Sequence, residues 1–171
     1  MRVLGIDPSS RATGFGIVEE KEGRYVPICY GTIKPSRDLS FHLKLDEIRT
    51  DLEKIIADYA PGEVAIESAF YAQNVKTALA LGQVRGACLI AVAAYRCALF
   101  EYSALEIKKA VTGYGQADKA QVLNMVKALL GIDDPALDSD AADALAAAVC
   151  HLNSREFGAR IKESEGTRGG A

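Results

Sequence analysis

Cysteine is scarce in this chain, and its spacing excludes the usual cysteine-based metal sites. The four cysteines stand at positions 29, 88, 97 and 150, without the short intervals that zinc and iron–sulfur ligands need. Cys88, Cys97 and Cys150 fall within helical patterns, where a free cysteine behaves as a small hydrophobic residue. We therefore expect reduced cysteines and a cytoplasmic location.

Histidine is equally rare, with His42 and His151 as its two representatives. His42 falls on the polar face of an expected helix. His151 follows Asp140 by eleven residues, about 16 Å along a helix, which is too far for the two to share a metal ion. Neither histidine is therefore assigned a catalytic role.

The chain also lacks an excess of positive charge. It has 20 lysine and arginine residues against 23 aspartate and glutamate residues, a formal net charge of −3. A general nucleic-acid binder is usually basic. Any DNA contact would have to come from a local basic face on an otherwise acidic protein.

Long uncharged apolar runs, internal repeats and low-complexity segments are not found. We therefore expect no membrane span and, because a strand begins at the second residue, no signal peptide. The 171 residues, 49% of them hydrophobic, fit one domain with a substantial core. We expect that domain over residues 1–153, followed by a polar, disordered C-terminal tail over residues 154–171.

The pattern of apolar residues predicts an α/β protein with a mixed five-stranded sheet flanked by helices. Three successive strands with tight turns, over residues 2–20 and 24–33, predict an antiparallel meander. Further strands are expected over 63–67 and 99–102, and helices over 39–59, 74–95, 104–111, 117–130 and 141–152. A helix between two strands implies a parallel crossover, so parallel strands should extend the meander.

Four carboxylates fall at the ends of these elements. Asp7 ends the first strand and Glu67 the fourth, and ligands bind at the carboxyl ends of strands in open α/β sheets. Asp140 and Asp143 share one face at the start of the last helix. Such a cluster would repel unless cations lay within it, and oxygen ligands suit Mg²⁺ or Mn²⁺. Two ions about 3.5–4 Å apart could act on a phosphodiester.

Each acid also has a simpler interpretation. An aspartate before proline, as at Asp7, is often a turn residue. Asp140 could cap a helix or interact with its dipole, and Glu67 could be an exposed strand end. The placement of all four at element ends favours a shared function.

Five blocks carry a family resemblance: LGIDPSSRATGFGIV, AIESAFYAQN, ALALGQVRGA, VTGYGQADKAQV and DSDAADALAAAVCH. Together they resemble the RuvC family of bacterial Holliday-junction resolvases from about residue 2 to residue 151. The resemblance implies a ribonuclease-H-like fold, in agreement with the element order above. It also implies that Asp7, Glu67, Asp140 and Asp143 are catalytic and bind two Mg²⁺ ions per active site, with Mn²⁺ as a substitute. The family commonly has glycine where this chain has Ser9, so the resemblance does not fix the conformation of the turn after Asp7.

The resemblance further implies DNA-binding residues. Phe70 matches a base-contacting aromatic, although Tyr71 beside it could also stack on an unpaired base. Lys108 and Lys119 flank a glycine-bearing loop and match lysines that act on the junction. Lys76, Arg85 and Lys109 are weaker candidates for the same basic face.

The main interpretation is a structure-selective endonuclease that resolves four-way DNA junctions by paired, symmetric, metal-dependent hydrolysis in recombination and repair. The resemblance implies a homodimer, for which the small-residue helix over 74–95 is the candidate contact, and a branch-migration complex of RuvA and RuvB type. An actin-like ATPase or sugar kinase is one alternative, but those proteins need two such domains. A non-catalytic junction-binding module is another, although this chain keeps all four acids.

Overall fold

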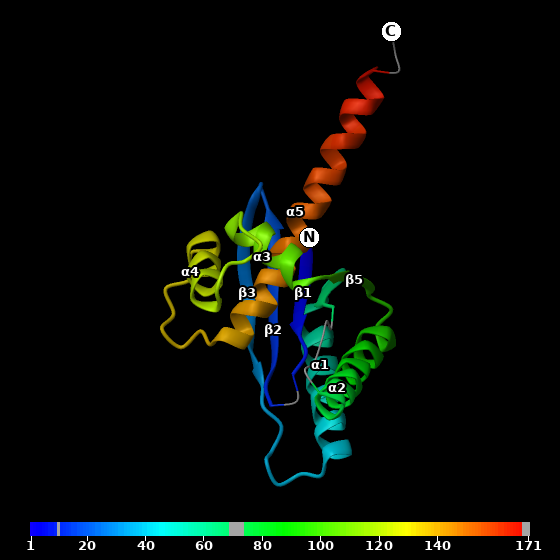
Figure 1. Cartoon of the computed structure of the whole chain (residues 1–171). Helices are drawn as coiled ribbons and strands as arrows, with labels where there is room; N and C mark the ends of the chain where they lie inside the picture. Colours follow the sequence, from blue (N-terminus) through cyan, green and yellow to red (C-terminus); the bar gives the residue numbers. More distant parts are fainter. Residues whose placement is uncertain (10, 69–73, 169–171) are drawn as a thin grey trace.

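Figure 1 shows the computed structural model of the chain, which describes residues 1–9, 11–68 and 74–168, with 158–168 as backbone only. Within these ranges five strands form one sheet, in the order β3-β2-β1-β4-β5. The strands are β1 (Arg2–Asp7), β2 (Thr13–Lys21), β3 (Arg24–Ile33), β4 (Glu63–Glu67) and β5 (Ala98–Tyr102). The predicted α/β class and mixed sheet are confirmed.

The pairing of the strands brings two chain segments to one edge of the sheet. β1, β2 and β3 form the predicted antiparallel meander. β4 runs parallel to β1 on its other side and β5 parallel to β4. Ile6 lies opposite Ile66 in the β1–β4 ladder, so the next residues, Asp7 and Glu67, leave their strands side by side.

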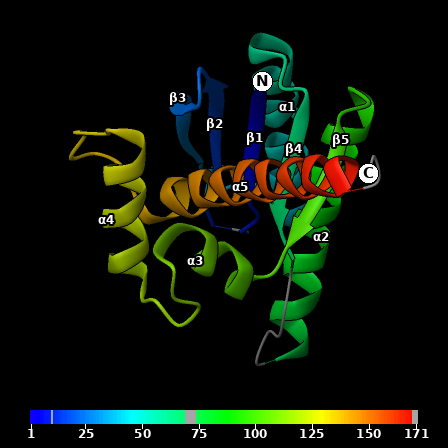
Figure 2. The same cartoon turned by 90° about the horizontal axis from the view of Figure 1, so that it is seen from above.

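Helices cover both faces of the sheet (Figures 1 and 2). They are α1 (Phe41–Tyr59) and α2 (Val75–Ala94) on one face, and α3 (Ala104–Thr112), α4 (Lys119–Leu130) and α5 (Ser139–Arg168) on the other. Strand side chains alternate between the two faces. Leu4 and Ile6 therefore pack with α1 and α2, whereas Val3 and Ala65 pack with α5.

Helix α5 lies directly on the strands because glycines face it. Residues 144–150 are buried at every position, as expected for a helix enclosed between a sheet and other helices. A Cβ atom on Gly5 would lie 1.8 Å from the carbonyl oxygen of Ala144, and one on Gly14 would lie 2.0 Å from that of Asp140. Only residues without a side chain allow this approach, which sets the position of the first turns of α5.

The C-terminal part of the chain differs from the expectation. The last helix was expected to end near residue 152, but α5 continues to Arg168 and projects beyond the sheet (Figure 1). No proline follows position 135, so no residue after the buried part forces a break. The division into a domain and a separate tail at residue 153 stays a prediction.

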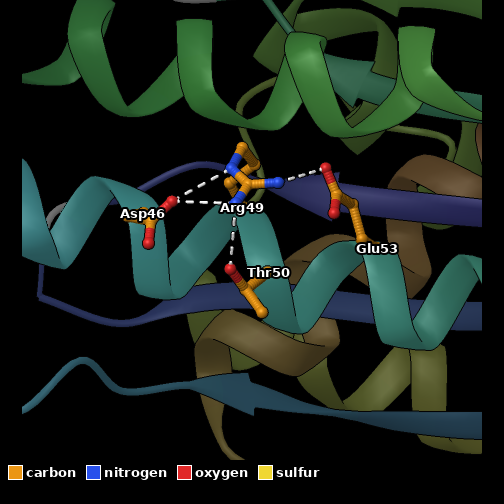
Figure 3. Close-up of polar contacts among 4 residues, drawn as sticks. All are labelled: Asp46, Arg49, Thr50 and Glu53. Carbon is orange, nitrogen blue, oxygen red and sulfur yellow. Dashed lines mark hydrogen bonds and ion pairs between the residues drawn. The ribbon is translucent and has the colours of Figure 1, made fainter.

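Helix α1 carries a network of charged residues on its surface (Figure 3). The Arg49 guanidinium donates hydrogen bonds to Asp46 and Glu53 at 2.8 and 2.5 Å, and a longer one to Thr50. Hydrogen bonds to these carboxylates raise the pKa of Arg49. Such pairs, three and four residues apart, support the helix locally.

Helix α2 corrects the expectation about apolar runs. Within the described part of the chain, α2 is a helix that is long enough and apolar enough to cross a bilayer, judged by length and composition alone. One of its faces is buried against α1 and the sheet through Val84, Ala87, Cys88 and Ala91. It also connects two parallel strands of the same sheet, so we interpret it as the crossover helix of the fold.

Replacing Gly5 with alanine should destabilise the protein by about 1–3 kcal/mol or more, because the new methyl group meets backbone atoms of α5 that cannot rotate away. Gly62→Ala is the matched control, since a Cβ there would meet no atom closer than 3.9 Å. Urea unfolding of both variants measures the difference. Equal stabilities would contradict the close contact between β1 and α5.

Candidate active site

Asp7 and Glu67 project from the same face of the sheet. They are the last residues of the neighbouring parallel strands β1 and β4. The preceding residues, Ile6 and Ile66, pack toward α1 and α2. Because side chains alternate along a strand, both carboxylates point to the side that α5 covers.

The start of α5 is held over these strands by a capping carboxylate. Asp138 accepts a hydrogen bond from the Ala141 amide at 3.0 Å and from the Thr32 hydroxyl at 2.7–2.8 Å. Asp138, rather than Asp140, therefore caps the helix, and Thr32 ties that cap to β3. The Asp140 backbone lies against Gly14, which pairs with Asp7 in the β1–β2 ladder. The structure thus places Asp140 beside the end of β1.

A cavity of about 310 Å³ opens at this edge of the sheet. It is lined by Asp7, Glu67, Ala104, Ile107, Lys108, Lys119, Val122 and Asp143. Three of the acids singled out in the sequence and two of the lysines therefore share one cavity. They come from five separate elements, so the fold assembles the site from distant segments.

The lysines partly compensate the negative charge. The Lys119 ammonium lies 3.1 Å from the Asp143 carboxylate, and this hydrogen bond raises the pKa of Lys119. Lys108 lies close enough to act against the rise in the pKa of Glu67. Both ammonium groups can also interact with a phosphate in the cavity.

Burial and mutual repulsion oppose the ionisation of the acids. Burial raises the pKa of Asp7 to about 7, and the charges of Glu67, Asp143 and Asp140 add to the effect. Burial, followed by the charge of Asp143, also raises the pKa of Glu67. Below about pH 7 a proton is therefore retained on Asp7, in a place where a cation would be favourable.

The donor set fits a hard cation in an open site. Within residues 1–9, 11–68 and 74–168, no group of three or more Asp, Glu, His or Cys side chains is placed so that it could hold a metal ion. Mg²⁺ keeps several of its waters and is held by few carboxylates together with substrate phosphates. Carboxylates spaced around a cavity are suited to that mode of binding.

The remaining predicted residues lie in different surroundings. Phe70 and its alternative Tyr71 lie outside the described residues. Lys76 is exposed and lines a neighbouring cavity of about 600 Å³. The Arg85 side chain is 13% exposed and donates a hydrogen bond to the Glu67 carbonyl oxygen. Their assignment as DNA-binding residues stays a prediction.

The sequence interpretation overlooked Arg11. This residue is exposed and lines the same cavity as Lys76, next to Pro8 and Ser9. Its position four residues after Asp7, in the turn between two strands, was the available signal. The turn is closed by a hydrogen bond of 2.8 Å from the Thr13 hydroxyl to the Ser9 carbonyl oxygen. Ser9 does not have a positive φ, so serine fits where the family commonly has glycine.

His151 belongs to a separate buried cluster. Its Nε2 atom lies 2.6 Å from the Glu63 carboxylate and its Nδ1 atom 2.7 Å from the Tyr102 hydroxyl. Glu63 begins β4, whereas Glu67 ends it. The histidine therefore lies away from the cavity that Asp7, Glu67 and Asp143 line.

Solved structures with a similar fold identify the class of protein. The chain is similar to a Thermus thermophilus RuvC in complex with Holliday junction substrate, with a TM-score of 0.86, 28% identity, and coverage of 92% of this chain and 96% of that one. A yeast mitochondrial Holliday junction resolvase is similar in fold, with a TM-score of 0.65 and 13% identity over 88% of this chain and 78% of that one. The fold is ribonuclease-H-like, of the type that Holliday-junction resolvases adopt.

The sequence relatives identify the family. Residues 3–151 match the family described as crossover junction endodeoxyribonuclease RuvC. Relatives of that name from Trichlorobacter lovleyi and Geobacter sulfurreducens are each 47% identical, covering 92% and 90% of this chain and 88% and 93% of their own lengths. The chain belongs to the RuvC family and is a Holliday-junction endonuclease of DNA recombination and repair. The ATPase, kinase and non-catalytic alternatives are therefore excluded.

The raised pKa of Asp7 predicts a pH-dependent effect of Asp7→Asn. Folding raises the pKa of Asp7 from its ordinary value of 3.8 to about 7. Between these two pH values the folded protein keeps a proton on Asp7 that the unfolded chain releases, so the wild-type protein loses stability as the pH rises through this range. Asparagine is neutral throughout. Without divalent metal, the stability of the Asp7→Asn variant relative to wild type should increase by about 2–3 kcal/mol between about pH 5 and pH 8.

Thermal unfolding of both proteins across this pH range measures the difference. Asp51→Asn on the surface of α1 is the control and should show no such trend. A constant difference between Asp7→Asn and wild type would mean that Asp7 ionises normally.

Proposed function

We propose that Asp7, Glu67, Asp140 and Asp143 are the catalytic, metal-binding acids of this endonuclease. One observation carries the proposal: burial at the strand ends, together with the charges of the neighbouring acids, raises the pKa of Asp7 to about 7. Such pKa changes cluster at functional sites. The expected reaction is paired, symmetric hydrolysis of phosphodiester bonds in two strands of a four-way junction.

The family is metal-dependent, and we assign two Mg²⁺ ions to each active site, with Mn²⁺ as a substitute. Bound at the four acids, the ions would supply an activated water and neutralise charge on the phosphate. The acids themselves hold the ions in place. Lys108 and Lys119 bind phosphate oxygens at the same cavity.

Junction binding should be structure-selective. The chain has a net charge of −3, so affinity for plain duplex is weak. Basic side chains gather instead around the two adjoining cavities: Lys108 and Lys119 in one, Arg11 and Lys76 in the other. Phosphate groups that converge at a crossover match this local arrangement.

A second copy of the chain is the expected partner of α2. Val75, Leu79 and Ile90 are 76%, 64% and 61% exposed on one side of this helix. Gly82 and Gly86 on the same side have open space above them, which permits close helix–helix contact. A twofold dimer would present two active sites to two strands of one junction. By the same family relationship, we place the protein in the cytoplasm with a branch-migration complex of RuvA and RuvB type.

Asp7→Asn and Glu67→Gln should each abolish cleavage while the junction still binds. Loss of one group that stabilises transition-state charge costs about 100–1,000-fold in rate. The assay uses a synthetic four-way junction, with and without Mg²⁺, and a sequencing gel that reveals paired symmetric nicks. Asp51→Asn should cut normally. Cleavage by Asp7→Asn or Glu67→Gln near the wild-type rate would refute the assignment.

Phe70→Ala should separate binding from cutting. Base stacking contributes about 1–3 kcal/mol per base, while phosphate contacts dominate affinity, so binding should fall modestly. Cleavage should fall more, because the stacked base holds the scissile phosphate in place. A thermal melt of the same variant provides the check. A large fall in Tm with proportionate loss of every activity would show that Phe70 is a core residue.

Leu79→Glu should convert the dimer to a monomer without loss of fold. The side chain is largely exposed in the single chain, so a charge there disfavours only the contact between two copies. Leu129→Glu on α4 is the control, since Leu129 is 45% exposed on the opposite side of the sheet. Sedimentation equilibrium distinguishes the two states. A dimer of unchanged affinity would place the interface elsewhere.

A further inference from the structure

Arg85 connects the end of β4 to a neighbouring strand. It is one of two charged residues in α2, together with Lys76. Its Nη1 atom donates a hydrogen bond of 2.6 Å to the carbonyl oxygen of Glu67. Its Nη2 atom lies 2.8 Å from the Glu101 carboxylate on β5. One guanidinium therefore fixes α2, β4 and β5 at the edge of the sheet that carries the acids.

These contacts hold the Arg85 guanidinium in the interior of the protein. Its side chain is 13% exposed, compared with 71% for Lys119. To contact a phosphate, Arg85 would have to leave both the Glu67 carbonyl oxygen and the Glu101 carboxylate. The negative charge of Glu101 would also repel the phosphate.

The Glu67 carbonyl oxygen is a sensitive place for such a contact. β4 ends at Glu67, while the following amide, of Ser68, donates to the Tyr102 carbonyl oxygen at 2.8 Å. Arg85 and Tyr102 thus hold opposite sides of the peptide group between residues 67 and 68. Anchoring that peptide group on both sides fixes the Glu67 Cα atom, from which the side chain projects. Hydrogen bonds from a charged donor are short and strong.

We propose that Arg85 is a positioning residue for junction cleavage, which holds the Glu67 carboxylate in place through the backbone of β4. The proposal rests on the assignment of Glu67 as a catalytic acid. The planar fork of arginine spans two acceptors, which the single ammonium of lysine cannot do in the same way. Arg85→Lys should therefore fail to replace it, although the charge is kept.

The test compares Arg85→Lys, Arg85→Met and Glu101→Ala with wild type. For Arg85→Met, the single-turnover cleavage rate at saturating enzyme should fall about 10- to 100-fold, as expected for a misplaced reacting group. The Mg²⁺ concentration at half-maximal rate should rise, and excess Mg²⁺ should partly restore the rate. Arg85→Lys should show a similar loss, and Glu101→Ala a smaller loss in the same direction.

Junction binding in EDTA distinguishes positioning from phosphate contact. Positioning predicts that the affinity of Arg85→Met and the slope of log Kd against log salt stay the same. A lost phosphate contact would reduce that slope by about 0.9. Glu101→Ala is the sharper variant, because removing an acid near a phosphate contact would tighten binding without slowing cleavage. Either of these phosphate-contact results would overturn the proposal.

Arg49→Met is the matched control. Arg49 is also a partly buried arginine with more than one acceptor, but its acidic partners, Asp46 and Glu53, both lie along α1 (Figure 3). It should lower Tm without changing the Mg²⁺ dependence of cleavage. If Arg85→Met does not fold, Arg85→Lys and Glu101→Ala carry the test.

Glu67→Gln distinguishes failure of the proposed active site from failure of the positioning role of Arg85. If Glu67→Gln cuts normally, the proposed active site is wrong. If Glu67→Gln is inactive but Arg85→Lys and Glu101→Ala cut at the wild-type rate, the site stands and the positioning role of Arg85 is wrong.

Discussion

The burial of mutually repelling carboxylates at one edge of the sheet is the constraint on which the rest of the structure depends. Burial alone disfavours the ionised form of Asp7, and three neighbouring acids add to that effect. A fold does not bring such groups together for stability, because each buried charge costs free energy unless it is compensated. Under the proposed function, cations bound between the acids would make this arrangement favourable, and stability would be exchanged for metal binding.

The fold maintains this arrangement with contacts that fix backbone positions. Gly5 and Gly14 allow α5 to lie against β1 and β2. Asp138 caps α5 and is tied to β3 through Thr32. Arg85 holds the end of β4 from the opposite face of the sheet. The acids thus lie on rigid elements, which limits how far repulsion can push them apart.

Local patterns were sufficient to predict much of the fold and of the site. Short apolar runs marked the strands, and the ends of two of these runs pointed to Asp7 and Glu67. The spacing of Asp140 and Asp143 placed both at the start of one helix. The lysines and Phe70 came from the family resemblance, since a surface lysine or an apolar aromatic has no distinctive local pattern.

Features that depend on distant partners could not be predicted in this way. The hydrogen bond that ties Asp138 to β3 comes from Thr32, which is 106 residues away. The inward orientation of Arg85 depends on Glu67 and Glu101, so the sequence alone favoured an exposed basic residue. The helix beyond residue 152 lacks the apolar periodicity on which the helix assignment depended, although its backbone continues to Arg168.

The most direct test of the proposed metal-binding acids is a carbon-13 NMR titration of the Asp7 carboxyl group, with and without Mg²⁺. In the metal-free protein the midpoint should lie near pH 7, in line with the pKa of about 7 that burial and the neighbouring acids produce. Saturating Mg²⁺ should move the midpoint well below that value, because the cation replaces the proton. A midpoint close to the ordinary value of 3.8, unchanged by Mg²⁺, would contradict the proposed centre.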